Sequence, residues 1–249
     1  MTLPANFNAS YSSLWDQMRW EPSAQQIEQF IALQQLLNNF NSQLNLTKLV
    51  DGEDYWIGQI FDSLWPFQKE LTTPHQLRNC IDVGTGCGFP GLAIAICLPG
   101  AKVTLVDSTR KKTTALKEII RELDLSSRIN ILTERIEVTA HRNTYRGQFN
   151  FAMARAVANA TVTAEYLIPL LKVDGEACLY RGKWNQEEEK SLLQALILLK
   201  GKISKIQELE LPANRGIRHF IRLKSESPCP TKYPRPTGVP TKKPLGIRQ

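Results

Sequence analysis

The chain has 249 residues, of which 42% are hydrophobic and 22% charged, which excludes global disorder and fits one large α/β domain with additions or two small domains. Its formal net charge of +7 makes a polyanion a candidate partner. No apolar run approaches the roughly 18 residues of a membrane span, and no basic segment followed by an apolar one resembles a secretory signal. We therefore expect a cytoplasmic protein without a membrane partner.

The cysteines argue against both a disulfide framework and a zinc site. The five are odd in number and widely spaced, no C-x-x-C pair occurs, and the three histidines stand far apart. We expect reduced, mostly buried thiols and no bound metal.

The first 75 residues predict a helical cap. Residues 1–22 resemble a variable lead-in in which Trp15 and Trp20 fold back onto the body. Ser23 is a suitable N-cap for a helix whose apolar side chains recur at helical spacing up to residue 44. A second helix is expected over 53–65. These helices must bury their apolar faces on another layer, so we expect a mainly structural role.

The stretch 80–91, Cys-Ile-Asp-Val-Gly-Thr-Gly-Cys-Gly-Phe-Pro-Gly, predicts a short buried strand, a glycine-rich turn and a helix that starts at Pro90. Glycines allow positive φ angles and a close approach to a ligand, and proline suits the first helical position. Backbone N–H groups at a helix start favour a polar or anionic partner. We interpret this stretch as a ligand-binding loop.

After the loop, predicted helices and strands alternate. Helices are expected at 90–98, 110–123, 160–171 and 186–199, and strands at 102–106, 128–132, 149–153 and 176–181, with a turn at Asp174-Gly175 before the last of these. Strands 202–210 and 217–224 form a predicted hairpin.

This alternation predicts an α/β fold with a mostly parallel, doubly wound, Rossmann-like sheet of seven strands, closed by an antiparallel hairpin. Ligands in such sheets bind beyond the carboxyl ends of the strands, where the strand order reverses. We expect three parts: a helical cap at 1–75, a ligand-binding domain at 76–224 and a tail at 225–249. The tail is basic and rich in proline, which predicts an extended arm rather than a packed element.

Two cofactors compete for the glycine loop. Gly86-x-Gly88-x-x-Gly91 fits the dinucleotide fingerprint GxGxxG, whereas Asp82-x-Gly84-x-Gly86-x-Gly88 fits the DxGxGxG loop of S-adenosylmethionine (AdoMet) enzymes. In a dinucleotide fold the first glycine directly follows the strand, and here that residue is Gly84. Counted from Gly84, the last glycine position of the fingerprint falls on Phe89, so the register favours AdoMet.

Asp107 ends the second predicted strand, where a carboxylate can accept both hydroxyls of an adenosine ribose. That geometry serves either cofactor, and the alternative is an N-cap of the following helix. After the third strand, Ile136 is expected beside an adenine ring, and Glu137 or a backbone group beside the exocyclic amine.

Absent motifs narrow the reaction. The Asn/Asp-Pro-Pro-Tyr motif that serves exocyclic amines is missing after the fourth strand, which reads Met153-Ala-Arg155-Ala-Val. Pyrimidine C5 methylation needs a thiolate nucleophile, and Cys229 lies in the tail rather than at a strand end. A guanine N7 has an in-plane lone pair and needs no general base, so the enzyme supplies orientation and electrostatics.

Together these residues resemble the small-subunit ribosomal RNA guanine-N7 methyltransferase G family, also called the glucose-inhibited division protein B family. The matching motifs are Asn45-Leu-Thr47, Asp62-Ser-Leu64, Asp82-Val-Gly-Thr-Gly-x-Gly-x-Pro-Gly91, Asp107-Ser108, Arg155-Ala156 and Tyr233-Pro-Arg-x-x-Gly-x-Pro-x-x-Lys-Pro-Leu245. They cover nearly everything except the start of the chain and the middle of the tail.

The resemblance implies a class I AdoMet-dependent methyltransferase that methylates N7 of one guanosine in 16S rRNA or the small ribosomal subunit. Nothing in the sequence demands a dimer, so we expect a monomer. Position by position, it implies cofactor contacts for Gly84, Gly86, Phe89, Asp107, Ser108, Thr109, Ile136, Glu137 and Arg155. Arg155 is also the candidate catalytic residue, as an orienting or target-contacting group; a surface ion pair is the alternative. One position departs from the family: a histidine is usual where this chain has Gln59, so a titrating role is in doubt there while a hydrogen-bonding role survives.

RNA contacts are expected from basic residues. Tyr233, Arg235, Lys242 and Lys243 lie between prolines, in a stiff segment that could bring charges and one stacking ring to a phosphate backbone. The alternative is that the tail straps across the domain. Arg142 and Arg146, with Lys111 and Lys112, are further phosphate candidates, for which solvated charge is the alternative.

Two other functions stay open from the sequence. One is a nicotinamide-dependent oxidoreductase, which would use the glycine loop for a dinucleotide. The other is a non-catalytic RNA-binding module that keeps a degenerate loop.

Overall fold

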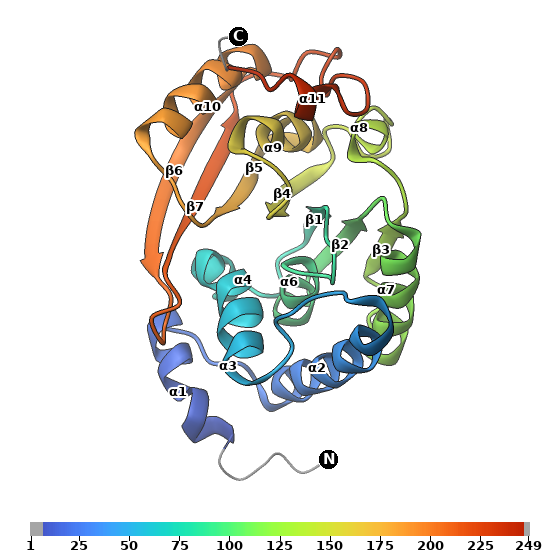
Figure 1. Cartoon of the computed structure of the whole chain (residues 1–249), viewed down its shortest axis with the longest axis vertical. Coiled ribbons are helices and arrows are strands. Elements are labelled where there is room, and N and C mark those ends of the chain that lie inside the picture. Colours follow the sequence, from blue (N-terminus) through green and yellow to red (C-terminus); the bar gives the residue numbers. More distant parts are fainter. Residues whose placement is uncertain (1–6, 247–249) are drawn as a thin grey trace.

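A computed structural model describes residues 7–246 of the chain (Figure 1). Its seven strands form one sheet in the order β3-β2-β1-β4-β5-β7-β6. Neighbours from β3 to β5 pair in parallel, and β7 pairs antiparallel with both β5 and β6. The strands are β1 (Arg78–Val83), β2 (Ala101–Val106), β3 (Ile129–Leu132), β4 (Phe149–Arg155), β5 (Leu171–Arg181), β6 (Gly201–Glu210) and β7 (Ile217–Ser225). The predicted α/β fold, with its closing hairpin, is confirmed.

The helices flank this sheet. They are α1 (Phe7–Met18), α2 (Ala24–Leu44), α3 (Gly52–Tyr55), α4 (Asp62–Leu64), α5 (Gln68–Leu71), α6 (Gly91–Cys97), α7 (Arg110–Glu122), α8 (Ile136–Thr139), α9 (Ala160–Leu167), α10 (Gln186–Leu199) and α11 (Val239–Lys242). A π-helical turn, Trp56–Phe61, joins α3 to α4, and short 3-10 turns cover Trp65–Phe67 and Ile168–Leu170. Within the described residues, no helix is both long enough and apolar enough to cross a membrane.

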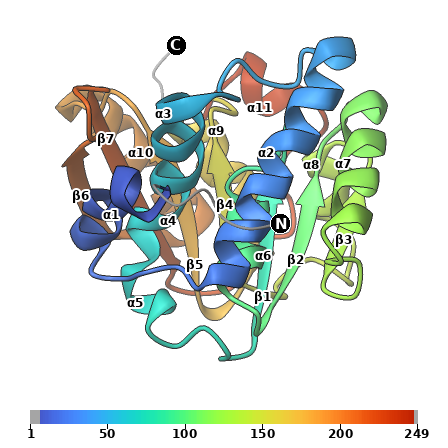
Figure 2. The same ribbon diagram turned by 90° about the horizontal axis from the view of Figure 1, so that it is seen from below.

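Two hydrophobic cores lie on opposite faces of the sheet. Because successive side chains of a strand point to opposite faces, Cys80 of β1 joins the core beneath α2, α6 and α7, while Ile81 and Val83 join the core beneath α9 and α10. Figure 1 shows α2 and α6 below the sheet and α8 to α11 above it. Figure 2 shows α2 crossing in front of α6, against which it packs.

The N-terminal cap begins with a helix that the sequence pattern does not predict. Residues 7–18, expected to belong to a variable lead-in, form α1, and Trp15 is buried with its ring 6.4 Å from that of Trp56. The predicted cap at Ser23 is confirmed, because its side chain and that of Gln26 form a capping box. Leu14, Trp15 and Met18 of the expected lead-in are therefore part of the core.

The second predicted helix, 53–65, is present but is not uniformly α-helical. Its middle, Trp56–Phe61, is a π-helical turn. Such widened turns often occur at functional sites, because they displace side chains and free a carbonyl. Gly58 and Gln59 lie within this turn.

Two boundaries differ from the sequence expectation. The turn predicted at Asp174-Gly175 lies inside β5, which runs unbroken from Leu171 to Arg181. Asp174 has a φ of +64°, and the β4–β5 register shifts between Phe149 and Phe151, so the expected turn is an irregularity within the paired strand. Pro90 is the N-cap of α6 rather than its first residue.

The tail is packed, and the prediction of an extended arm is wrong. Tyr233 and Leu245 are buried in the core beneath α9 and α10. Arg146 donates to the carbonyls of Tyr233, Cys229 and Pro230 at 2.7, 2.8 and 3.1 Å. The tail is therefore a strap across the domain, the second of the two alternatives.

The cysteines follow the sequence expectation. All five are free, with Cys80, Cys87, Cys97 and Cys178 buried and Cys229 partly exposed. Burial raises the pKa of Cys80 to about 12 and that of Cys229 to about 11, although Arg146 offsets part of the effect at Cys229. These thiols stay protonated at neutral pH.

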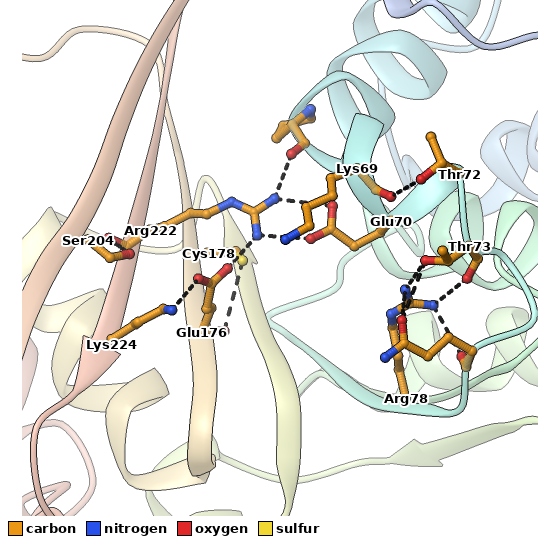
Figure 3. A network of polar contacts seen from close by, with 12 residues as sticks. Lys69, Glu70, Thr72, Thr73, Arg78, Glu176, Cys178, Ser204, Arg222 and Lys224 are labelled. Atoms are coloured by element: carbon orange, nitrogen blue, oxygen red, sulfur yellow. Dashed lines mark hydrogen bonds and ion pairs between the residues drawn. The ribbon is translucent and has the colours of Figure 1, made fainter.

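A buried arginine cluster ties the cap to the closing hairpin (Figure 3). Arg222 of β7 forms ion pairs with Glu176 of β5 and, at 3.2 Å, with Glu70 of α5. It also donates to the carbonyl of Pro66 at 2.7 Å, and its guanidinium lies 5.3 Å from the ring centre of Phe220. Burial alone would lower the pKa of Arg222, but the two carboxylates outweigh it and raise the pKa.

Candidate functional site

The glycine loop lies at the carboxyl edge of the sheet, between β1 and α6, at the point where the strand order reverses between β1 and β4. Asp82 anchors it from below: one carboxylate oxygen accepts from the Thr85 hydroxyl at 2.6 Å and from the Gly91 N–H at 2.9 Å. Burial raises the pKa of Asp82 to about 6, because its charged form loses solvent. The aspartate fixes the loop from inside the protein and does not face a ligand.

Gly84 forms the floor of the loop. It has a φ of +67°, and a Cβ at this position would lie 2.7 Å from a methyl carbon of Val157. Only glycine fits both the left-handed backbone and the contact. The residue is exposed, so its backbone is open to a ligand.

Asp107 stands at the end of β2, opposite the loop. One carboxylate oxygen accepts from the Gly86 N–H at 3.0 Å and the other from the Thr109 N–H at 2.8 Å. The N-cap of α7 is Thr109, so the alternative that Asp107 caps this helix is excluded. Because each carboxylate oxygen has two lone pairs, each can still accept a hydroxyl from a ligand.

A pocket of about 240 Å³ opens beside these residues. It is lined by Val83, Gly84, Val106, Asp107, Ser108, Glu134, Arg135, Ile136, Val157, Ala158, Tyr166 and Thr241. Four predicted cofactor residues, Gly84, Asp107, Ser108 and Ile136, line it together. The remaining walls come from the ends of β3 and β4, from α9 and from the tail.

Other predicted residues lie around this pocket without lining it. Gly86 and Thr109 contribute N–H groups to Asp107. Phe89 is 2% exposed, with its ring 6.2 Å from that of Tyr55, so its side chain does not line this pocket and its expected contact with the cofactor stays a prediction. Its apolar ring is buried in the core of the cap rather than in the pocket.

Glu137 serves the tail rather than the pocket. Its Oε1 accepts from the Gly238 N–H at 3.0 Å and from the Tyr166 hydroxyl at 3.2 Å, while Oε2 lies 3.5 Å from Arg135. Burial alone would raise the pKa of Glu137, but Gly238 and Arg135 outweigh it and hold the pKa below its usual range. The tail therefore occupies Oε1, and the expected contact between this carboxylate and an adenine amine stays a prediction.

Arg155 ends β4 and points toward the cap. Nη1 donates to the Gly58 carbonyl at 3.0 Å and to Asp62 Oδ2 at 3.2 Å, and Nη2 donates to Gln59 Oε1. The guanidinium also lies 5.7 Å from the ring centre of Phe89. These contacts place Arg155 in a half-buried cluster, not in the surface ion pair that was its alternative.

Asp62 is the acidic member of this arginine cluster. Burial raises its pKa, although Arg155 and Arg218 both oppose the shift. The Arg218 Nε of β7 lies 3.6 Å from Asp62 Oδ1. The cluster therefore joins α4, β4 and β7 beside the glycine loop.

The residue after Arg155 is in an unusual conformation. Ala156 has a φ of +55° and is exposed. A non-glycine residue in the left-handed region costs energy, and such residues are concentrated at functional sites. The turn carries Arg155 to one side of the glycine loop and Val157 to the pocket on the other.

The predicted RNA contacts divide into two groups. Tyr233 is 4% exposed, so its predicted stacking role is wrong. Arg146 is occupied by tail carbonyls, and Arg235 forms a 2.6 Å ion pair with the fully buried Glu165. Lys242, at the end of α11, and Lys243, its C-cap, are exposed, and Arg142 is exposed but paired with Glu134 at 2.6 Å.

A larger hollow, about 490 Å³, lies at the amino ends of β1 to β3 around Lys102, Arg128 and Tyr145. We favour the smaller pocket as the site. Ligands of doubly wound sheets bind at the carboxyl ends of the strands, and only the smaller pocket contains the glycine loop and Asp107.

Several pocket residues were not predicted from the sequence. Tyr166 of α9 and Thr241 of α11 come from elements far from the loop in the chain. Val157 and Ala158 could have been found, because they directly follow a predicted strand at the ligand-binding edge. No local sequence signal marks Tyr166 or Thr241 as a pocket residue.

Comparison with known proteins places the chain in a family. The family model for rRNA small subunit methyltransferase G matches residues 26–220. A Ribosomal RNA small subunit methyltransferase G from Prochlorococcus marinus is 55% identical, covering 98% of this chain and 97% of that protein. The protein of the same name from Parasynechococcus marenigrum is 54% identical, covering 94% and 95%.

A solved structure of a protein from Corynebacterium glutamicum shares the fold. It is 17% identical, with a TM-score of 0.54, and the match covers 87% of this chain and 97% of that one. Because the family model spans most of the chain and both relatives align over nearly all of it, the chain belongs to the rRNA small subunit methyltransferase G family.

Proposed function

We propose that this protein transfers a methyl group from AdoMet to N7 of one guanosine in 16S rRNA of the small ribosomal subunit. Membership of the family and the names of its relatives support the reaction class and the RNA substrate. The observation that carries the proposal is the pocket at the carboxyl edge, with Gly84 in its floor and Asp107 at its rim. Such a substrate also supports a cytoplasmic location.

The residues present fit AdoMet. Asp107 has free lone pairs for the ribose hydroxyls, and Ile136 offers an apolar side chain for the adenine. Gly84 leaves the space that a Cβ would fill against Val157. We propose Gly84, Asp107, Ser108 and Ile136 as direct contacts, and Gly86 and Thr109 as the groups that hold Asp107 in place.

When bound, AdoMet supplies an electrophilic methyl group on a sulfonium. The protein then has to hold the guanine so that its N7 lone pair faces that methyl group, because no proton needs to be removed first. Arg155 is the candidate for this work. Its hydrogen bonds to the protein use three of the five N–H groups of a guanidinium, and among residues 7–246 no partner takes the others. These can bind the base or its phosphate.

The basic surface for RNA is smaller than the sequence suggests. We propose Lys242 and Lys243 as phosphate contacts, because both are exposed at the end of α11, directly after the pocket residue Thr241. Arg142 can join them if it leaves Glu134. We also propose that the parts 1–75, 76–224 and 225–249 act as cap, catalytic domain and strap.

The test is methyl transfer in solution. We expect the purified protein with labelled AdoMet to label 16S rRNA or the small subunit, and the digested RNA to yield 7-methylguanosine. Preference for NADH over AdoMet in a binding titration would favour the oxidoreductase instead. RNA binding without transfer would favour a non-catalytic module, and a label at a base other than guanine would overturn the assigned acceptor.

A further inference from the structure

Gln59 lies in the π-helical turn of the cap and is 1% exposed. Both ends of its amide have partners. Oε1 accepts from Arg155 Nη2, while Nε2 lies 3.1 Å from Thr47 Oγ1 and 3.5 Å from the Leu49 carbonyl. The amide therefore links a loop of the cap to the last residue of β4.

The hydrogen bonds fix which way this amide points. A flipped amide would set its NH₂ group against the Arg155 guanidinium, donor against donor, and would leave the Leu49 carbonyl without its amide donor. Thr47 holds the amide in turn, because the Thr47 hydroxyl is also placed by the Leu49 N–H at 3.1 Å. The acceptor face of Gln59 is therefore directed at Arg155.

The π-helical turn gives Arg155 two adjacent acceptors. The Gly58 carbonyl binds Nη1 and the Gln59 side chain binds Nη2, so consecutive residues hold both terminal nitrogens of the fork. Space for a different arrangement is limited, since a Cβ at Gly58 would lie 3.3 Å from Leu49 Cδ1. A long, flexible arginine side chain is thereby confined to one orientation.

We propose that Gln59 is a positioning residue for the methyl transfer: its amide connects Thr47 to Arg155 and holds the guanidinium so that its remaining N–H groups face the acceptor guanosine. This inference rests on the proposed function. A buried polar chain across three segments costs free energy unless every member is satisfied. Apolar side chains could fill this space, so the hydrogen-bonded series of Thr47, Gln59 and Arg155 indicates that the guanidinium has to be held in one orientation.

The experiment compares Gln59→Leu with the control Gln34→Leu. Gln34 is a partly buried glutamine that donates to the same loop, to the Val50 carbonyl at 2.8 Å, but it does not contact Arg155. We expect Gln59→Leu to lower kcat for 16S rRNA methylation roughly ten- to hundredfold, the size of effect that a displaced reacting group produces. The Kd for AdoMet should change less than about twofold, and Gln34→Leu should keep the wild-type kcat.

Gln59→His supplies a readout that a merely structural role would not change. A neutral imidazole can donate to Thr47 and accept from Arg155, whereas an imidazolium can only donate. The ratio of variant to wild-type kcat should therefore be near one at pH 8 and fall below about pH 6.5. The charged or titratable groups that face this position are Arg155 of β4, Asp62 of α4 and Cys87 of the glycine loop.

The outcomes separate this inference from the proposed function. A wild-type protein that transfers no methyl group overturns both. An active wild type with Gln59→Leu as active as Gln34→Leu overturns the inference alone. If Gln59→Leu does not fold, the pH ratio for Gln59→His decides, and a ratio that stays constant with pH contradicts the positioning role.

Discussion

Arg155, which is half-buried, and Arg222, which is buried, both bind the cap to the same face of the sheet. They differ in the partners that surround each guanidinium. Arg222 has two carboxylates, the Pro66 carbonyl and three phenylalanine rings around it. Arg155 has one carboxylate, the Gly58 carbonyl, the Gln59 amide and one ring. Arg222 lies midway along β7, and Arg155 lies at the carboxyl edge of the sheet, at the end of β4.

The difference separates a structural arginine from a functional one. The ion pairs of Arg222 lie level with residues 151–153 of β4, away from the glycine loop. Arg155 lies beside the loop, is 16% exposed, and precedes a residue with a positive φ. A buried arginine is thus no sign of function by itself; its place at the ligand-binding edge and its free N–H groups are the signs.

The largest effect is expected from Arg222→Met. It leaves the buried Glu70 without its cation and costs Glu176 its closest one, and breaking a buried ion pair from one side costs about 3–5 kcal/mol. We expect the free energy of unfolding, measured by urea titration, to fall by about that amount. The kcat of the folded fraction should stay near the wild-type value.

A triple variant serves as the control for this prediction. Replacing Arg222, Glu70 and Glu176 together by Met, Leu and Leu removes the charges on both sides, and such replacements are often neutral. Most of the lost stability should return. A triple variant as unstable as the single one would show that packing, not charge, explains the loss.

The next effect is on catalysis, from Arg155→Lys. Lysine keeps the charge near Asp62 but loses the planar fork, so it cannot reach Gly58, Gln59 and an acceptor base together. We expect kcat to fall about 10²–10³-fold, the usual cost of removing one oriented donor. The free energy of unfolding should fall by much less than in Arg222→Met. Equal turnover by Arg155→Lys and the wild type would remove Arg155 from the reaction.

Asp107→Ala separates cofactor binding from the work of Arg155. The change removes the ribose acceptor and the partner of the Gly86 and Thr109 N–H groups. We expect AdoMet binding to become undetectable by calorimetry, which means a loss of at least about a hundredfold, or about 3 kcal/mol. Circular dichroism should show a retained fold. Unchanged affinity would mean that the cofactor lies elsewhere.

The smallest effect concerns the pKa of Asp82. Burial raises this pKa to about 6, and the positive charge of Arg155 opposes part of the rise. As the pH falls, the native state therefore binds this proton before the unfolded state does. The protonated Asp82 stabilises the fold at low pH, and this contribution is lost as the pH rises from about 4 to about 6. Carbonyl-carbon NMR should find a higher Asp82 pKa in Arg155→Met. In Arg222→Met the pKa of Asp82 should stay the same. A shift of similar size in that variant would contradict the view that Arg155, and not Arg222, lies beside the glycine loop.

The fold, and the meeting of Gly84, Asp107 and Ile136 at one pocket, could be predicted from the sequence because their signals are local. Gly84, Asp107 and Ile136 each follow a predicted strand, and parallel strands bring such ends together. The family resemblance, drawn from motifs, is likewise confirmed.

The errors share another cause: residue types that suit RNA also suit the protein's own backbone. Arg146 and Arg235 were assigned to phosphates, but one binds tail carbonyls and the other binds Glu165, 70 residues away in the chain. Tyr233 was assigned to base stacking, but its side chain is buried in the core beneath α9 and α10. Such partners are distant in sequence, so composition could not reveal them.

The most direct test measures both arginines in one assay. Single-turnover methylation of the small subunit by Arg155→Lys and Arg222→Met should be followed at low temperature, where circular dichroism shows that both are folded. We predict that Arg222→Met reacts within about threefold of the wild type, while Arg155→Lys is slower by at least about a hundredfold with AdoMet affinity unchanged. A slow Arg222→Met beside a fast Arg155→Lys would contradict the account.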